Sequence, residues 1–580
     1  MKFFSNKDIV KLLRSVSAAY TVKGGDRFKI IAYDRAADSI DHSTSETKDL
    51  WEEGKLDSVP GLGKSMQAHL DELFKTGKVD HFQEVMKGLP EGMFELLDIP
   101  GMGPKNAYKL SEKLKLRSID DLEKAATNGK IRALPGFGEK SEKDILNSIS
   151  ELRKRSGRYI LPYAHAITQR FLDYLRTQKE CEIAEPLGSL RRMTATVGDI
   201  DIGVASNQPQ KIVEHFQKFH EVKRILEAGE RTASVILKNG VQVDLKIQPR
   251  QSFGALLQHF TGSKNHNIHL REIAKQKDMS LSEYGIKIKS KINKFDNEHD
   301  FYKALGMDYI EPELREDSGE IEAAIAHQLP KLVESQDIKG DVHIHSSYPI
   351  EPSHDLGANT FQEIINKAKK LKYEYIGFSD HSPGYHNHTK RQIIDLIKKR
   401  KKQIEQLKSS NKTVGILNLL EIDLLANGEL SVPEEGLILL DGVIAGIHSG
   451  HHQDKKMITK RLLKACYSPY VKVISHPTNR LLQERESSDA DWPTIFEACV
   501  KTKTVLEINA WPSRLDLPDT LTREAIKSGV KLIINSDAHA VDQMENIKFG
   551  VAVARRGWAT KKDIINTLPW TDFRKHFTKD

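Results

Sequence analysis

The spacing of apolar residues changes twice along the 580-residue chain. The first 155 or so residues have the pattern of helices, and residues 156–250 mix helical stretches with strand-like alternation. Beyond about residue 335, short apolar runs such as 375–378 and 505–508 alternate with helical stretches down to the C-terminus. This alternation favours a parallel α/β barrel or layered sheet, in which active residues sit at the carboxyl ends of the strands.

Composition narrows the class of protein. The chain is 38% hydrophobic and 29% charged, which is typical of a globular protein, and its length predicts about four domains. A net charge of +7 is compatible with nucleic-acid binding without requiring it. The low count of three cysteines indicates a reducing compartment, and no stretch has the ~18 apolar residues of a membrane span or the pattern of a signal peptide. We therefore expect a cytoplasmic protein, monomeric by default, with no membrane partner.

A turn of the form apolar-Pro-Gly-apolar-Gly occurs three times in the helical region, at 59–63, 99–103 and 134–138. Each turn follows one helical stretch and opens another, which is typical of a helix-hairpin-helix. The glycines bring backbone amides to the start of the second helix, where they can hold a DNA phosphate without reading sequence. A plain tight turn would look the same in a single copy, but three copies favour DNA binding. The glycines expected to contact DNA are Gly61, Gly63, Gly101, Gly103, Gly136 and Gly138.

Residues 188–203 are the most informative stretch of the chain. Gly188 and Ser189 form a small turn that lets backbone amides approach a phosphate. Arg191 and Arg192 follow at once and can neutralise the charge of that phosphate.

Two aspartates close this stretch. Asp199 and Asp201 alternate with isoleucines, so both carboxylates lie on one face of a predicted strand. A third carboxylate, Asp244, lies in the alternating run 241–247. Neighbouring carboxylates repel each other unless a cation lies between them, so the pattern predicts a Mg²⁺ or Mn²⁺ site for phosphoryl or nucleotidyl transfer. The alternative, an edge strand with solvated aspartates, does not account for the adjacent turn and arginines.

Nearly every predicted strand beyond residue 335 ends in a metal-type ligand. In motifs such as 341–345 and 537–539, ligands two positions apart on a strand face the same way. Imidazole with carboxylate suits Zn²⁺, Mn²⁺ or Fe²⁺, and eight ligands are too many for one ion, so we expect two or three ions. Such a site activates water and clamps a phosphate, as in a metallophosphoesterase. The eight residues are His343, His345, His381, Glu421, His448, His476, Asp537 and His539.

The first 315 or so residues resemble the family X DNA polymerases, the DNA polymerase beta group, whose Gly-Ser-x-Arg-Arg…Gly-Asp-x-Asp motif stands at 188–201. The resemblance assigns two Mg²⁺ or Mn²⁺ ions to Asp199, Asp201 and Asp244. It implies that Ser189 and Arg192 bind the β and γ phosphates of a dNTP and that Gly188, in the same turn, also belongs to the nucleotide site. Arg191 has the same chemistry as Arg192 but is ranked below it. The family's Phe-Thr-Gly-Ser segment, beside the sugar of the incoming nucleotide, places Phe260 and Gly262 in the nucleotide site.

Residues 336–580 resemble the polymerase-and-histidinol-phosphatase (PHP) domain, a distorted (β/α)7 barrel with three metals. The two parts in this order are similar to the bacterial and archaeal X-family polymerases. The resemblance implies a DNA-dependent polymerase that fills short gaps in base-excision repair. It further implies a barrel that trims 3′ ends as a metal-dependent 3′–5′ exonuclease or 3′-phosphatase. Gapped or nicked DNA and dNTPs are the expected partners.

The resemblance also divides the chain into α+β and α/β domains. We expect an 8-kDa-like helix-hairpin-helix domain at 1–90, fingers with two helix-hairpin-helix motifs at 91–155, a nucleotidyltransferase palm at 156–250, a thumb at 251–318, a linker at 319–335 and the PHP barrel at 336–580. Residues 311–320 are polar and turn-prone, and so contribute to the expected linker.

Three positions depart from the family pattern. His69 stands where polymerase beta has the lysine that forms an imine with an abasic sugar, so a lyase step is doubtful, although Lys64 and Lys75 offer other amines. Gln242 replaces a helper arginine two residues before the third aspartate. After the His-x-His motif, an insertion displaces the family's Ser-Asp-Gly, and Asp355 is the residue best placed to replace its aspartate.

Two other functions remain open on the sequence. One is a nucleotidyltransferase acting on tRNA or a small molecule, against which the three hairpins argue. The other is a gap-filling polymerase whose PHP barrel is only a structural scaffold, because metal ligands can persist for the folding energy that they supply.

Overall fold

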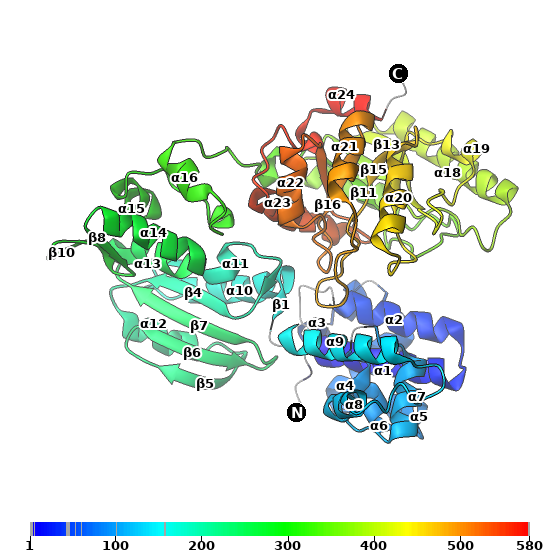
Figure 1. Ribbon diagram of the computed structural model, residues 1–580, viewed down its shortest axis with the longest axis horizontal. Helices are drawn as coiled ribbons and strands as arrows, with labels where there is room; N and C mark the ends of the chain where they lie inside the picture. Colours follow the sequence, from blue (N-terminus) through cyan, green and yellow to red (C-terminus); the bar gives the residue numbers. More distant parts are fainter. Residues whose placement is uncertain are drawn as a thin grey trace. The chain divides into compact units, whose positions relative to one another are not determined.

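The computed structural model describes residues 4, 6–41, 47–52, 54–59, 61–99, 101–155 and 158–577 (Figure 1). The chain divides into two compact units. One contains residues 1–159, 217–227 and 234–243, and the other contains residues 160–216, 228–233 and 244–580. No helix within the described ranges is long and apolar enough to cross a lipid bilayer.

The N-terminal region is helical, as its apolar spacing predicts. Two apolar cores hold its helices: Leu13 and Leu70 are fully buried in the first, and Leu110 and Leu122 in the second. The helices therefore pack around two successive cores, α1 to α5 around the first and α6 to α9 around the second, with Ala18 of α1 reaching the second core as well. In chain order they are α1 (Asn6–Lys23), α2 (Arg27–Asp41), α3 (Thr47–Glu52), α4 (Lys64–Thr76), α5 (Asp80–Met86), α6 (Glu91–Leu96), α7 (Pro104–Leu114), α8 (Ile119–Thr127) and α9 (Glu139–Arg155).

A five-stranded sheet with the order β2-β4-β7-β6-β5 follows. Ile200, Ile202, Val243 and Leu245 are buried on one face of β4 and β7, so the residues that alternate with them lie on the other face. Because β4 and β7 are neighbours, this alternation places Asp201 and Asp244 side by side. The elements are β1 (Tyr159–Ile160), α10 (Leu161–Arg176), β2 (Ile183–Pro186), α11 (Gly188–Arg191), β3 (Thr196–Val197), β4 (Ile200–Ala205), α12 (Pro209–Gln217), β5 (Val222–Ala228), β6 (Thr232–Leu237) and β7 (Gln242–Gln248).

The next segment combines helices with a small antiparallel sheet of order β10-β9-β8. The helical stretch expected at 267–276 lies within α14. The elements are α13 (Phe253–Thr261), α14 (Lys264–Gln276), β8 (Met279–Ser282), β9 (Gly285–Ile288), β10 (Lys291–Asn293), α15 (Glu298–Ala304), the 3₁₀ turn η3 (Pro312–Leu314) and α16 (Glu320–Ile325).

Residues 311–320 differ from the polar linker expected there. Arg315 and Glu320 are fully buried. Arg315 forms an ion pair of 2.5 Å with Glu298, and Glu320 accepts a 2.7 Å hydrogen bond from His266. A polar sequence predicts an exposed segment because charged side chains are seldom buried without a partner. Here Arg315 and Glu320 each have a partner inside the fold, so they can be buried.

The C-terminal region is a nearly closed parallel barrel of seven strands in sequential order, β11 to β17, as predicted (Figure 1). Its ends meet where Ile344 forms a parallel bridge with Ala538 and the His345 N–H donates to the Ala538 carbonyl at 2.8 Å. The strands are β11 (Gly340–Ile344), β12 (Tyr375–Phe378), β13 (Gly415–Asp423), β14 (Gly442–Gly446), β15 (Val471–Ile474), β16 (Val505–Asn509) and β17 (Leu532–Asn535).

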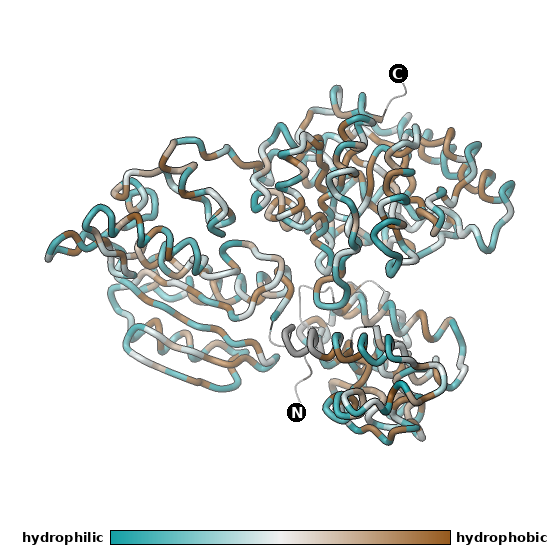
Figure 2. The backbone as a smooth tube through the Cα atoms, viewed as in Figure 1, coloured by the Kyte–Doolittle hydropathy of each residue, from teal (hydrophilic) through white to brown (hydrophobic). Residues whose placement is uncertain are grey.

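Helices alternate with these strands, and each buries one side. In α18, Ile393, Ile397 and Ile404 are buried at helical spacing, and the backbone tube alternates between hydrophobic and hydrophilic colouring along this helix in Figure 2. The helices are α17 (Phe361–Lys370), α18 (Lys390–Ser410), α19 (Glu434–Leu437), α20 (Lys455–Cys466), α21 (Trp492–Thr502), α22 (Asp519–Lys527), α23 (Ile547–Arg556) and α24 (Trp570–Phe573).

Candidate active sites

Three aspartates form the first site. Asp201 lies in β4 and Asp244 in the adjacent β7, while Asp199 immediately precedes β4 and is exposed. Burial and the charges of Asp244 and Asp199 raise the pKa of Asp201 to about 6, against the lowering effect of Lys246. Removal from water, and secondly the two like charges, therefore disfavour the ionised form of Asp201, a cost that a divalent cation would offset.

The turn before this strand is packed directly against Asp201. Gly188 has a left-handed φ of +58°, and a Cβ atom there would stand 2.7 Å from Asp201 Oδ2. The Leu187 N–H donates to the Asp201 carbonyl at 2.8 Å, which fixes the two segments together. Gly188 and Ser189 begin the short helix α11, so the expected phosphate-binding turn lies beside the carboxylates.

The two arginines of the motif have different surroundings. Arg191 is bound to Glu298 at 2.5 Å and donates to Thr261 Oγ1 at 2.6 Å, so its charge is already satisfied inside the protein. Arg192 points elsewhere: its Nε donates to Glu316 at 2.9 Å, and its Nη1 donates to the Thr261 carbonyl. Both side chains are 14% exposed and paired with a carboxylate, so the ranking of Arg192 above Arg191 for nucleotide binding stays a prediction.

The end of α13 supplies the other predicted nucleotide residues. Phe260 is half-buried, and the Lys246 ammonium lies 5.6 Å from its ring centroid. A Cβ atom on Gly262 would meet Arg192 Nη1 at 3.2 Å, so a side chain there would crowd that guanidinium. Lys246 and Arg192 therefore connect the Phe-Thr-Gly-Ser segment to the aspartates and to the phosphate-binding turn.

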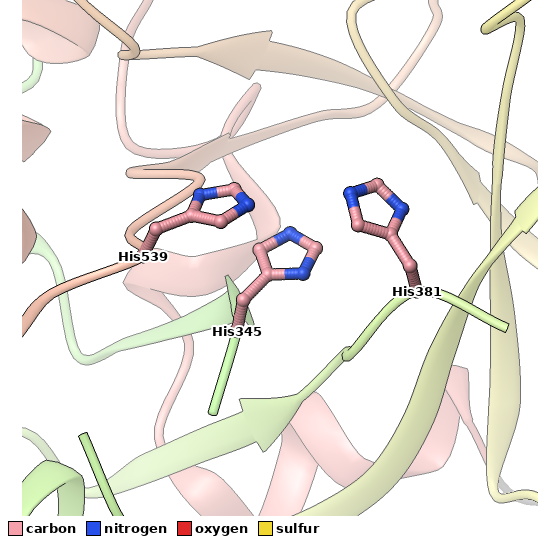
Figure 3. Close-up of side chains that lie close together, drawn as sticks. All are labelled: His345, His381 and His539. Carbon is pink, nitrogen blue, oxygen red and sulfur yellow. The ribbon is translucent and has the colours of Figure 1, made fainter. Parts of the chain in front are cut away.

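The second site gathers at the carboxyl ends of the barrel strands. His345 stands between His381 and His539, and the three rings come from separate strand ends (Figure 3). The ring centroids of His345 lie 4.0 Å from His539 and 4.5 Å from His381. All three side chains are buried or nearly so, and together they could hold one ion.

Glu421 in β13 is the centre of this cluster. Its carboxylate oxygens lie 2.9 Å from a ring nitrogen of His476, 3.1 Å from one of His343 and 3.3 Å from those of His381 and His448. It belongs to two groups of closely spaced ligand atoms, His343-His345-Glu421-Asp537 and His381-Glu421-His448. A carboxylate shared by two groups is the arrangement expected for a bridging ligand between ions.

Several ring nitrogens in the cluster are buried without a hydrogen bond. Folding has removed each of these nitrogens from water. Three of them lie 3.1–3.4 Å from a carboxylate oxygen but do not form a hydrogen bond with it. Such atoms are rare in proteins because leaving them unpaired is costly, and a coordinated metal satisfies them. The donor set therefore fits divalent ions. The atoms are His343 Nε2, His345 Nδ1, His381 Nδ1, His476 Nδ1 and His539 Nε2.

Electrostatics divide the cluster into charged and neutral groups. Burial alone would raise the pKa of Glu421, but His343 and His448 hold it well below the ordinary value. Burial lowers the pKa of His345 well below the ordinary value, with help from His539 and His381. His345 is therefore neutral at physiological pH, the form of imidazole that binds a metal.

Sequence reasoning missed carboxylates that orient these ligands. Glu507 accepts from His343 Nδ1 at 2.7 Å, and Asp423 accepts from His448 Nδ1 at 2.7 Å. Carboxylates in this position fix the tautomer and orientation of a metal-binding imidazole. Both lie in strands, in Leu-Glu-Ile-Asn and Leu-Leu-Glu-Ile-Asp, so a charged residue within an apolar run was the available signal.

The inserted segment after the His-x-His motif adds two further residues. Asp355 lies 3.4 Å from His539 Nε2 and 3.6 Å from His381 Nε2, where the loose alignment expected a ligand. His354 forms a group with Asp423 and His448 that sequence reasoning did not anticipate.

Two arginines beside the cluster were also missed. Burial is the main cause that lowers the pKa of His476, and the charge of Arg514 is the second. The same two causes, in the same order, lower the pKa of Arg485 to about 10. Both guanidiniums donate to Asn479, an uncharged partner. Two nearby cations held by a neutral side chain favour an anion such as a DNA phosphate.

Comparison with known proteins decides the family. Residues 4–79 match a helix-hairpin-helix domain, 93–151 a SAM-like helix-hairpin-helix tandem, and 256–316 the DNA polymerase beta thumb. The chain is 34% identical over 573 residues to the DNA polymerase/3′-5′ exonuclease PolX of Bacillus subtilis, which covers 98% of each protein. The chain belongs to family X of the DNA polymerases.

More distant relatives match parts of the chain. DNA polymerase lambda of Rattus norvegicus is 25% identical over 350 residues, 54% of this chain and 56% of its own length. A probable phosphatase of Thermoanaerobacter is 26% identical over 237 residues, 39% of this chain and 89% of the phosphatase. The predicted resemblance to family X is thus confirmed, and the phosphatase match is consistent with a PHP barrel.

The hairpin turns of this family X chain share one backbone conformation. The first glycine of each turn is left-handed, with φ of +79° at Gly61, +81° at Gly101 and +87° at Gly136. L-residues rarely adopt such angles, so glycine is required at each first position.

The second glycine of each turn directly precedes a helix. Gly63 and Gly103 are the N-caps of α4 and α7, and Gly138 is followed by α9. A Cβ atom at any of the three would meet nothing within 4 Å, so the start of each helix offers room for a phosphate oxygen, although the Gly63 N–H itself donates to the Gly61 carbonyl at 3.2 Å.

The first hairpin lacks the amine of the polymerase beta lyase. The ring of His69 stacks on His81 with centroids 5.1 Å apart, and burial together with His81 lowers its pKa. Lys75, one of the alternative amines, is paired with Asp71 at 2.8 Å. A lyase step is therefore not proposed for position 69.

Proposed function

We propose that this DNA-directed DNA polymerase fills short gaps during base-excision repair and that its barrel trims 3′ ends as a metal-dependent 3′–5′ exonuclease or 3′-phosphatase. The observation that carries the proposal is the group of three neighbouring carboxylates around Asp201, next to the turn at Gly188. A site of this kind serves nucleotidyl transfer.

In the polymerase site, Asp199, Asp201 and Asp244 would hold two Mg²⁺ or Mn²⁺ ions. Bound there, the ions supply a lower pKa for the primer 3′ hydroxyl and charge stabilisation for the triphosphate. Ser189 and Arg192 would bind the β and γ phosphates.

The end of α13 completes the nucleotide site. Phe260 and Gly262 would lie beside the nucleotide sugar, because the Lys246 and Arg192 side chains connect them to the aspartates and to the phosphate-binding turn. The absence of a side chain at Gly262 keeps the Arg192 guanidinium uncrowded.

In the barrel, the eight predicted ligands, with Asp355 in addition, would hold two or three ions of Mn²⁺, Zn²⁺ or Fe²⁺. The ions supply an activated water and a clamp on the terminal phosphodiester. Glu507 and Asp423 orient His343 and His448 for this task, and Arg485 and Arg514 would neutralise the phosphate of the strand being trimmed.

The helix-hairpin-helix turns would bind the DNA backbone. The helix starts at the second glycines, where a Cβ atom would meet nothing within 4 Å, would hold phosphates without regard to sequence, as a repair enzyme requires. Gapped or nicked DNA and dNTPs are then the partners, and a monomer remains the expectation.

One assay tests both activities. A labelled primer on a one-nucleotide gap with a 5′ phosphate is incubated with Mn²⁺, with and without dNTPs. We expect filling with dNTPs and 3′ shortening without them. Filling alone would leave the barrel as a scaffold or as a phosphatase of another substrate, and the absence of both from folded, metal-loaded protein would contradict the proposal.

Two variants assign the activities to their sites. We expect Asp201→Ala to remove incorporation and leave 3′ shortening, and His343→Ala to abolish shortening and spare incorporation. His386→Ala is the matched control for the second variant, because His386 is an exposed barrel histidine outside the cluster, its ring tilted by 38° against that of Tyr385. Loss of both activities in either active-site variant would show coupling or misfolding instead.

A further inference from the structure

The last residue of α23 in the barrel reaches the polymerase motif. Arg556 is largely buried, with 10% of its side chain exposed. Its Nη1 donates to the backbone carbonyl of Arg192 at 2.9 Å and to Glu316 Oε1 at 2.9 Å, while its Nε donates to Asp519 at 2.7 Å. A barrel side chain thus touches the backbone of the arginine assigned to the dNTP phosphates.

Glu316 joins the two arginines. The same carboxylate oxygen, Oε1, accepts from Arg192 Nε and from Arg556 Nη1, each at 2.9 Å. When a triphosphate binds, it competes with Glu316 for the Arg192 guanidinium. A second cation on Glu316 lowers the cost of that exchange, because the carboxylate keeps a partner when Arg192 turns away.

The backbone contact has a separate effect. Arg192 ends the Gly-Ser-x-Arg-Arg turn, and the following residue, Met193, has a left-handed φ of +53°. That conformation is strained for a residue with a side chain and persists only where neighbours hold it. The hydrogen bond from Arg556 to the Arg192 carbonyl is one such restraint, at the peptide group that joins the two residues.

We propose that Arg556 is a positioning residue for nucleotide binding: by holding the Arg192 carbonyl and sharing Glu316, the PHP barrel sets the affinity of the polymerase site for dNTPs. The inference rests on the proposed role of Arg192. It extends that function, because it makes the barrel a contributor to polymerisation as well as the location of 3′ trimming.

The neighbouring residue provides a matched control. Arg555 also lies at the end of α23, and it pairs with Glu313 at 2.7 Å and Glu311 at 3.3 Å. It joins the same helix to residues that precede Arg315, and its hydrogen bonds and ion pairs within the described residues go to Glu311, Glu313 and Val333 instead of Arg192 or Glu316. An Arg555 variant therefore shows how much dNTP binding depends on the packing of α23 as a whole, without disturbing the contacts to Arg192 and Glu316.

The experiment measures KM for dNTP and kcat on a one-nucleotide gap, with the full-length, metal-loaded protein. We expect Arg556→Ala to raise KM about tenfold with kcat within about twofold, a size typical of losing charge-assisted hydrogen bonds. We expect Arg555→Ala to leave KM within about twofold. The 3′–5′ exonuclease rate of each variant shows that the barrel is folded, and Arg556→Lys replaces the alanine variant if that rate falls.

A double-mutant cycle shows whether the effect runs through Arg192. If it does, Arg556→Ala raises KM far less in an Arg192→Ala background than in the wild type. Additive effects, an unchanged KM in Arg556→Ala, or an equal rise in Arg555→Ala would each overturn the proposal. Failure of the underlying function is distinguishable, because then Arg192→Ala alone leaves KM for dNTP unchanged.

Discussion

The Asp201 carboxylate rests against the backbone of Gly188, where an added Cβ atom would stand 2.7 Å from Oδ2. The same glycine has a left-handed φ of +58°. A larger residue at this position would therefore both strain the turn and displace the Asp201 side chain. The phosphate-binding turn and the metal-binding strand are therefore a single packed unit, and neither can shift without moving the other.

Gly188→Ala is expected to reduce nucleotide incorporation on the order of a hundredfold, because displacement of a catalytic group by about 1 Å has effects of that size. Single-turnover incorporation on gapped DNA measures it, with exonuclease activity as the folding check. Gly240→Ala is the matched control, since Gly240 is also left-handed, at +88°, but its Cβ atom would meet nothing within 4 Å. A similar loss in both variants would indicate general damage to the sheet.

Asp201→Asn should stabilise the metal-free protein while removing incorporation. The folded-state pKa of Asp201, about 6, lies above its ordinary value of 3.8, so ionisation opposes folding increasingly as pH rises through that interval and fully above it. The gain on substitution is at most about 3 kcal/mol, at about 1.4 kcal/mol per pKa unit.

The measurement is thermal unfolding of the variant and the wild type in EDTA. We expect the variant to be more stable at pH 8, with the difference shrinking at pH 5, where the wild-type carboxyl is largely protonated. Equal stability of the variant and the wild type at both pH values would show that ionisation of Asp201 does not oppose folding.

Glu421→Gln is expected to remove more than one metal ion per chain. Its carboxylate belongs to two ligand groups, whereas His539, among the described residues, belongs to one. Metal content by elemental analysis should therefore fall further for Glu421→Gln than for His539→Ala, and both should lose 3′ shortening. Loss of a single ion in each would contradict a bridging role for Glu421.

Glu298→Gln is expected to destabilise the thumb by about 3–5 kcal/mol, because it leaves Arg191 and Arg315 without their shared buried partner. Burial would raise the pKa of Glu298, but Arg315 and Arg191 hold it at about 2. Its contribution to stability is therefore present above pH 4.5, the ordinary value, and is lost as pH falls towards 2.

Urea unfolding at pH 7 and limited proteolysis of the thumb measure this effect. Asp300→Asn is the control, since Asp300 lies on the same helix, α15, but is exposed and bonded to Asn297. A change of under about 1 kcal/mol for Glu298→Gln would show that the two arginines find other partners.

Much of both sites followed from alternation alone. Period-two spacing placed Asp201 opposite the buried Ile200 and Ile202, and ligands at strand ends predicted the cluster around Glu421. The same rule, applied to Asp423 two positions after Glu421, would have found the partner of His448. These residues were predictable because their neighbours in sequence fix the direction in which they point.

Other contacts had no local signal. Arg191 and Arg192 are chemically identical in the motif, and only the fold directs one to Glu298 and the other to Glu316. Asp355 lies in an irregular insertion, where no periodicity fixes its direction. Arg556 contacts a carbonyl 364 positions away, a pairing that depends on tertiary packing alone.

The unpaired ring nitrogens of the barrel also limit how this protein can evolve. A descendant that kept the barrel only as a support would bear the cost of five buried, unsatisfied nitrogens as soon as it stopped binding metals. Selection for stability would then favour leucine or phenylalanine at positions such as His345 and His381. Intact histidines there are therefore what a barrel that still binds metals requires, and their loss in a relative would mark a barrel that had become inert.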